Sequence, residues 1–152
     1  MRILIFGVLA LVCQWSTAQS AELTGPGRFC GYSPIIDLLP GEKVTVLEGG
    51  IHAGSFRWEG NFGSLDVKGI GWASRPKGRI IHHPGTEYAV FAQRRNEGHY
   101  TVAIWNGAHG AAYFQSDKHF SEEQYAAIDR VRLFEEGEQP SNCMLRTSFS
   151  LE

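Results

Sequence analysis

Short runs of alternating apolar and polar residues dominate the chain between residues 43 and 114, and turn-forming dipeptides separate them. An alternation with a period of two places every second side chain on one face of a β-strand. The dipeptides Gly49-Gly50, Pro84-Gly85 and Asn106-Gly107 are typical of tight turns between antiparallel strands. The pattern therefore predicts an antiparallel meander.

The expected strands follow from the bounds of these runs. We expect strands over residues 43–48, 51–58, 62–70, 79–82, 87–93, 99–105 and 108–114. Residues 35–39 are predicted to form either a turn or a short strand. Residues 22–34, which contain several glycines and prolines, are expected to be irregular.

The Asn106-Gly107 dipeptide also predicts a register. A two-residue turn places Trp105 opposite Ala108 and leaves small side chains between Trp105 and Phe114 on one face. We expect the helix described next to pack on this face. The alternative is a ligand groove edged by Trp105 and Phe114.

One helix is predicted near the C-terminus. Ser121 is a favourable N-cap residue, and Gln124, three residues later, completes a capping box. The apolar residues that follow recur at helical spacing: Ala127, Ile128, Val131 and Phe134. We expect Gly137 and Pro140 to end the helix. The predicted fold class is α+β: a mostly antiparallel β-sheet, as a meander that is curved or partly closed, with one C-terminal helix packed on it and a final strand over 145–151.

The N-terminus has the layout of a secretory signal. A basic start is followed by an apolar run over residues 3–12 and then by small residues around Ala18. We expect a signal peptide over 1–18, cleavage between residues 18 and 21, and a single globular domain over 22–152. The alternative, a retained membrane anchor, is disfavoured because the apolar run is too short to cross a bilayer.

The chain has three cysteines, of which Cys13 would leave with the signal peptide. Cys30 and Cys143 would remain, and a pair of cysteines in an exported protein predicts a disulfide. Free thiols or a metal site are the alternatives, and the sequence has no CxxC motif to support a metal. The predicted location is outside the cytoplasm, with the periplasm as the default and the extracellular space as the alternative.

Catalytic and metal motifs are missing from the sequence. The chain has six histidines but neither HExxH nor His-x-His, so a composite site such as His83 with His99 lacks support from spacing. There is no GxSxG motif. Glu59 and Asp66 are candidate paired carboxylates, but the sequence does not fix their separation, which decides glycosidase chemistry. We therefore predict no catalytic residue, no metal and no cofactor.

The aromatic residues favour binding over catalysis. Trp72, Arg75 and Lys77 lie in a glycine-flanked loop, and Trp105 lies beside a turn; these residues are the predicted ligand site. The alternative for Trp72 is a place over the core. The formal charge of −2 does not point to nucleic acid. We expect a non-enzymatic binding module whose partner is an envelope protein or glycan. The alternative is a small secreted hydrolase that uses histidine with a carboxylate or a metal.

Overall fold

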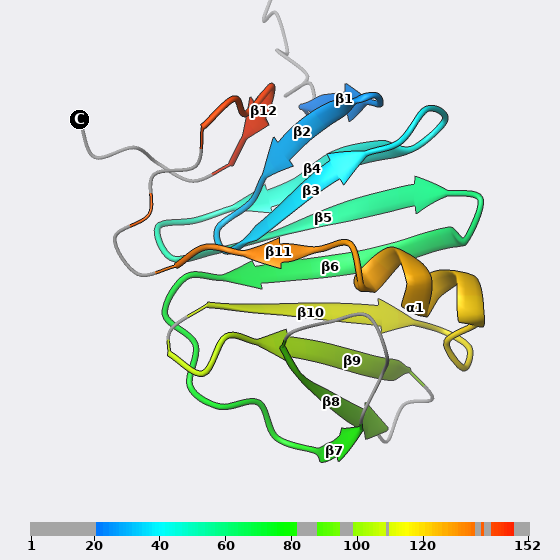
Figure 1. Ribbon diagram of the computed structural model, residues 1–152, viewed down its shortest axis with the longest axis vertical. Coiled ribbons are helices and arrows are strands. Elements are labelled where there is room, and N and C mark those ends of the chain that lie inside the picture. The colour runs from blue at the N-terminus through cyan, green and yellow to red at the C-terminus, as the bar shows by residue number, and fades with distance from the viewer. Residues whose placement is uncertain are drawn as a thin grey trace, which may run out of the picture.

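The computed structural model describes residues 21–81, 88–94, 99–108, 110–135, 138 and 141–147, with only the backbone described for residues 93 and 94. The predicted signal peptide and the expected Pro84-Gly85 turn lie outside the described residues. The same holds for His82, His83 and His109. The described residues form two β-sheets and one short helix (Figure 1).

The large sheet has eight strands in the order β1-β4-β5-β6-β10-β9-β8-β7, and each pair of neighbours is antiparallel. The strands are β1 (Glu22–Thr24), β4 (Lys43–Gly49), β5 (Ala53–Gly60), β6 (Gly63–Ile70), β7 (Arg79–Ile81), β8 (Ala89–Arg94), β9 (Tyr100–Trp105) and β10 (Ala111–Ser116). The sheet is open, with β1 and β7 at its edges. It is therefore mostly antiparallel as predicted, but it is not closed.

Two meanders form this sheet, and they join through β6 and β10. The chain therefore leaves β6 in the middle of the sheet and begins the second meander at the far edge, in β7. The connection over residues 71–78 runs past the ends of β10 and β9 to reach that edge (Figure 1). This route places the connection beside the ends of β10 and β9 (Figure 1).

The small sheet has the order β11-β3-β2-β12, and it crosses in front of β4, β5 and β6 in Figure 1. Its strands are β2 (Gly27–Cys30), β3 (Pro34–Leu38), β11 (Arg132–Leu133) and β12 (Leu145–Arg146). The segment 22–34 is thus not irregular as predicted: Gly25-Pro26 and Gly31 lie between strands β1, β2 and β3, while Gly27 and Pro34 begin β2 and β3. The final strand is present as β12, which pairs parallel to β2.

The core lies between the two sheets. Its members are fully or nearly fully buried: Phe29, Ile36, Leu38, Val44, Phe56, Trp58, Leu65, Val67, Val90, Val102, Ile104, Ala112, Phe114, Ala127, Ile128, Val131 and Leu133. Alternation explains the contribution of β5, in which Phe56 and Trp58 face inward while Arg57 between them is exposed. Burial of large apolar side chains supplies the main favourable term in folding.

The register predicted for the Asn106-Gly107 hairpin is wrong. Trp105 pairs with Ala111, not with Ala108, because residues 106–110 form a longer connection. The Asn106 side chain shapes it: its Oδ1 accepts hydrogen bonds from the backbone N–H groups of Ala108 and Gly110 at 3.1 and 3.0 Å. Gly107 has the positive φ expected of it, at 84°, whereas Asn106 does not.

The corrected register also removes the predicted groove between Trp105 and Phe114. Phe114 is fully buried and pairs with Val102 in the core. Trp105 pairs with Ala111, and since side chains alternate along a strand, it projects to the opposite face. The two aromatic residues therefore edge no common site.

The helix α1 (Glu122–Ile128) begins as predicted. Ser121 Oγ accepts a hydrogen bond from the N–H of Gln124 at 3.3 Å, and Gln124 Oε1 accepts one from the N–H of Ser121 at 3.1 Å. The helix ends earlier than predicted. Val131 and Leu133 are buried while Arg132 between them is exposed, a period of two that suits the strand β11.

The predicted disulfide is confirmed. Cys30 and Cys143 are bonded, with Cα atoms 5.7 Å apart across a sequence separation of 113. The bond holds the start of the C-terminal segment beside β2, where β12 pairs. Within the described part of the chain, no helix has the length and apolar character needed to cross a membrane.

Candidate functional site

The loop that carries the predicted ligand site is fastened to the sheet at several points. The N–H of Gly71 donates to the carbonyl of His52 at 2.9 Å, and Ala73 and Pro76 are buried. Between these anchors Trp72 is 67% exposed. The loop therefore holds Trp72 outward rather than over the core.

Arg75 and Trp105 meet through Phe91. The guanidinium of Arg75 lies 5.6 Å from the centroid of the Phe91 ring, which places it within cation–π range. Phe91 in turn makes an edge-to-face contact with Trp105 at 6.4 Å between centroids. Since Phe91 is buried, these contacts fasten Arg75 to the sheet, although Arg75 is exposed like Trp72 and Lys77.

The segment from residue 72 to residue 81 is basic and partly apolar on its surface. It carries Arg75, Lys77 and Arg79, all exposed, and no carboxylate. No ion pair among the described residues involves Lys77 or Arg79. Ile80 is 55% exposed. Sequence reasoning did not include Arg79 or Ile80, although both directly continue the loop.

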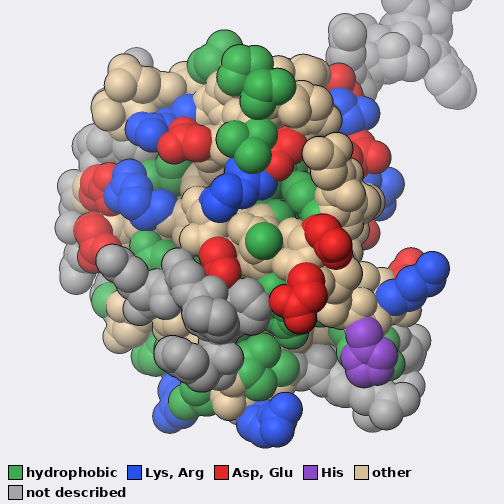
Figure 2. All heavy atoms as spheres, turned by 45° about the vertical axis from the view of Figure 1, so that its right-hand side comes forward, with side chains coloured by type: hydrophobic (Ala, Val, Ile, Leu, Met, Phe, Trp, Pro, Cys, Tyr) green, Lys and Arg blue, Asp and Glu red, His purple; other side chains and the backbone are tan. Residues whose placement is uncertain are grey.

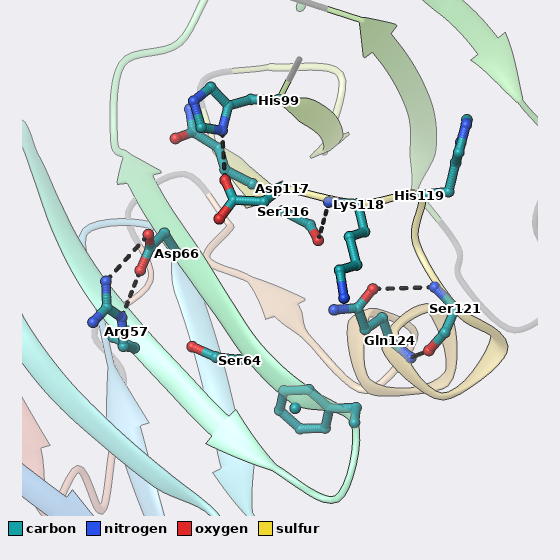
Figure 3. Close-up of a pocket in the computed structure, with 13 residues that line it drawn as sticks. Arg57, Ser64, Asp66, His99, Ser116, Asp117, Lys118, His119, Ser121 and Gln124 are labelled. Carbon is teal, nitrogen blue, oxygen red and sulfur yellow. Dashed lines mark hydrogen bonds and ion pairs between the residues drawn. The ribbon is translucent and has the colours of Figure 1, made fainter. Parts of the chain in front are cut away.

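A second site, which sequence reasoning missed, lies at the other end of the large sheet. It is a groove of about 780 Å³ between the β5–β6 turn, the end of β10 and the start of α1 (Figure 3). We call it the polar groove. Its lining includes Arg57, Phe62, Asp66, His99, Asp117 and Gln124.

Cross-strand pairing explains the first polar pair of the groove. Arg57 on β5 lies opposite Asp66 on β6, and its Nε and Nη2 donate to the two carboxylate oxygens at 2.8 and 3.3 Å. These hydrogen bonds raise the pKa of Arg57 above its usual value. Gln115 on β10 lies opposite Asp66 on its other side. The three side chains form one polar row across the sheet.

His99 and Asp117 form the second polar pair. They extend the β9–β10 ladder, and His99 Nδ1 lies 2.7 Å from Asp117 Oδ1. The side chains are 49% and 85% exposed, so water reaches both. Because Asp117 engages Nδ1, the other ring nitrogen remains for a ligand. Nearby, His119 stacks on Tyr100 with ring centroids 4.0 Å apart.

The lower wall of the groove combines an aromatic ring with the start of the helix. Phe62 makes an edge-to-face contact with the buried Trp58, at 4.8 Å between ring centroids. Gln124 is only 8% exposed, and its oxygen is held by the N–H of Ser121. Figure 3 shows the Gln124 amide at the edge of the groove, with Lys118 extending toward it.

The structure gives little support to the catalytic alternatives. Glu59 lies 3.2 Å from Lys43 Nζ, and Asp66 is bound by Arg57, so each carboxylate already has a cationic partner. Among the described residues, no three His, Cys, Asp or Glu side chains gather in a way that could hold a metal ion. The candidate His83–His99 pair is not tested, since His83 lies outside the described residues.

Comparison with protein-family models, curated proteins and solved structures finds no match to this chain. The function is therefore argued from the geometry of the loop and the groove alone.

Proposed function

We propose that the chain is an exported, non-enzymatic binding module that docks onto an acidic surface of a protein in the cell envelope. The observation that carries the proposal is the 67% exposure of Trp72 on a loop whose neighbours Ala73 and Pro76 are buried. Export is supported by the disulfide, since disulfides persist in oxidising compartments, and by the signal-like N-terminus. The periplasm is the default location.

The docking surface is the Trp72 segment, by which we mean residues 72–80. It combines the exposed apolar groups Trp72 and Ile80 with three cations and no carboxylate. Ile51, which is 79% exposed, lies on the adjacent β4–β5 connection that accepts the hydrogen bond from Gly71. Tryptophan and arginine are the residue types most enriched in binding hot spots. The absence of carboxylates from the segment selects an acidic partner by charge complementarity.

The anchoring of the loop favours binding. A loop that is already fixed in its bound conformation loses less conformational freedom on association. Here the backbone hydrogen bond of Gly71, the burial of Pro76 and the Arg75–Phe91 contact fix the loop. Arg75 and Trp105 therefore fix the loop to the sheet through Phe91, and the exposed Trp72, Arg75 and Lys77 make the contact.

A small secreted hydrolase is the second candidate, and the His99–Asp117 pair is the observation in its favour. A carboxylate bound to Nδ1 orients a catalytic imidazole in serine hydrolases. However, Ser116 Oγ accepts a hydrogen bond from the N–H of Lys118, and Ser64 lies on the opposite wall of the groove (Figure 3). Neither hydroxyl faces the His99 ring. The binding module is therefore the better-supported function.

The docking proposal is tested by retention of envelope proteins on the immobilised mature chain. We expect Trp72→Ala, and separately Lys77→Glu with Arg79→Glu, to weaken binding of the same acidic protein at least tenfold. Met144→Ala is the matched control, because Met144 is also 67% exposed but lies at the small sheet. The retained protein is then purified and titrated against each variant at rising salt concentration.

Equal binding by the wild type and both variants would exclude the Trp72 segment as the docking surface. Binding that salt does not weaken would exclude an acidic partner surface. If activity screening instead finds a hydrolase that His99→Ala inactivates, the second candidate replaces the first.

A further inference from the structure

We propose that the polar groove is a separate binding site for a neutral oligosaccharide. The groove lies at the opposite end of the large sheet from the Trp72 segment, near the β5–β6 turn and α1. The proposal goes beyond the docking function and does not depend on it. It rests on the charge balance of the groove, on the fixed positions of its polar groups and on the ring of Phe62.

The charges that line the groove cancel. Arg57 and Lys118 contribute two positive charges, and Asp66 and Asp117 contribute two negative charges, with histidine counted as neutral. Figure 2, which brings this side of the molecule forward, shows acidic and basic side chains interspersed with uncharged ones. Such a lining gives no net attraction to an anion or a cation. It suits hydroxyl groups, because each hydroxyl both donates and accepts hydrogen bonds.

The polar groups are held in place while part of their hydrogen-bonding capacity remains unused. Arg57 uses Nε and one Nη2 hydrogen on Asp66, which leaves its Nη1 group. His99 is held through Nδ1, which leaves Nε2. Donors and acceptors that are already oriented lose little side-chain entropy when a ligand binds.

Gln124 adds a further hydrogen-bond donor at the edge of the groove. Its side chain is more than nine-tenths buried, and its oxygen is fixed by the N–H of Ser121. No described residue accepts a hydrogen bond from its NH₂ group, which Figure 3 places toward the groove. This nitrogen is not among the buried side-chain atoms that lack a partner, so it counts as a donor open to the groove rather than as an orphaned buried group. It can donate to a sugar hydroxyl in the groove.

Phe62 supplies an apolar surface beside these polar groups. Its ring is partly buried and is fixed against Trp58 at 4.8 Å between centroids. The carbon-bound hydrogens of a sugar ring can pack on such a ring while the hydroxyls reach the polar wall. A volume of about 780 Å³ lies within the range of roughly 300–1,000 Å³ typical of ligand sites. A mixed polar and aromatic groove of this size fits a short neutral glycan.

The test is calorimetric titration of the mature protein with cellohexaose, xylohexaose, chitohexaose and maltohexaose, with a heparin-derived hexasaccharide as the anionic probe. We expect at least one neutral hexasaccharide to bind with a Kd on the order of 1 mM or lower. Asp117→Asn and Phe62→Leu should each weaken that binding at least fivefold. Asp37→Asn, which alters a carboxylate outside the groove, is the matched control for charge and should leave sugar binding unchanged.

Asp117 is 85% exposed, so its variant reports on the groove even if Phe62→Leu perturbs packing. Failure of all four neutral sugars to bind below about 10 mM would overturn the proposal. Binding that both groove variants leave unchanged would also overturn it, as would tighter binding of the heparin fragment through the same residues. Trp72→Ala should bind the sugar with the same Kd as the wild type. A failure of the docking function would therefore leave this proposal standing, and the reverse.

Discussion

Asn106→Ala should destabilise the protein far more than a typical substitution in a surface turn. The Asn106 side chain makes three hydrogen bonds: its Nδ2 donates to the carbonyl of Phe134 at 2.9 Å, and its Oδ1 accepts from Ala108 and Gly110. Each hydrogen bond contributes about 0.5–1.5 kcal/mol net. We therefore expect a loss of about 2–4 kcal/mol in the free energy of unfolding.

The assay is equilibrium urea unfolding of the mature, oxidised protein, followed by tryptophan fluorescence and circular dichroism. Asn61→Ala is the matched control. Asn61 also lies in a connection between two paired strands, but it is exposed, and among the described residues its side chain makes no hydrogen bond. We expect this control to lose less than about 0.5 kcal/mol. If Asn106→Ala unfolds within about 0.5 kcal/mol of the control, Asn106 does not determine the connection, and the argument for the register is wrong.

Four further outcomes follow from burial, covalent linkage and charge. Cys143→Ser should lose about 5 kcal/mol by the loop-entropy relation for a separation of 113, as measured by guanidinium unfolding. Trp58→Ala should lower the free energy of unfolding by about 3–5 kcal/mol because Trp58 is fully buried. Trp72→Ala should lower it by only about 1 kcal/mol in the same guanidinium experiment, because Trp72 is exposed. Glu42→Ala should lower the free energy of unfolding by about 2–3 kcal/mol, because it removes the buried Glu42 carboxylate from its ion pair with Arg130. Arg130 is partly exposed, so water can solvate its charge in the variant and the loss stays moderate. Hydrogen bonds from Arg28 lower the pKa of Asp37, so the stability they give is present above about pH 4 and is lost as the pH falls further. In Asp37→Asn, the free energy of unfolding should therefore fall less steeply as the pH is lowered below about 4.

Local signals in the sequence predicted the elements whose geometry depends on near neighbours. The capping box of Ser121 and Gln124 formed as expected, because both hydrogen bonds lie within one helical turn. Strands β4 and β5 lie within two residues of their predicted bounds, since alternation over seven or eight residues fixes a strand. The disulfide followed from the cysteine count once Cys13 was assigned to the signal peptide.

Long-range contacts explain the errors. The β6–β10 pairing joins two meanders, and no turn between them specifies it. The helix prediction ran on through Val131 because its spacing from Ile128 suits a helix, but pairing of Arg132 and Leu133 with β3 favours a strand. The Gly49-Gly50 hairpin is present with a longer turn, in which the Tyr32 hydroxyl accepts a hydrogen bond from the N–H of Gly50. These tertiary contacts override the local pattern.

The polar groove was predictable only in part. Gly60 pairs with Gly63 across a two-residue turn, and this register places Arg57 opposite Asp66, so the sequence contained that ion pair. The His99–Asp117 pair depends on the β9–β10 register, which the Asn106 side chain sets through a longer connection. The wrong register predicted at Asn106-Gly107 therefore hid the His99–Asp117 pair, which is one of the two polar pairs of the groove.

The disulfide also decides how the folded chain responds to mechanical force. A pull on the two ends loads β1, β2 and β12 and then Cys30 and Cys143, where the covalent bond bears the load. The 113-residue separation corresponds to roughly 400 Å of extended chain that a pull cannot draw out while the bond is intact. Strands β4 to β10 lie inside this closed ring, so tension detaches β1, β2 and β12 while both proposed binding surfaces stay unloaded. The region between the two cysteines would therefore stay folded under tension until the disulfide is reduced.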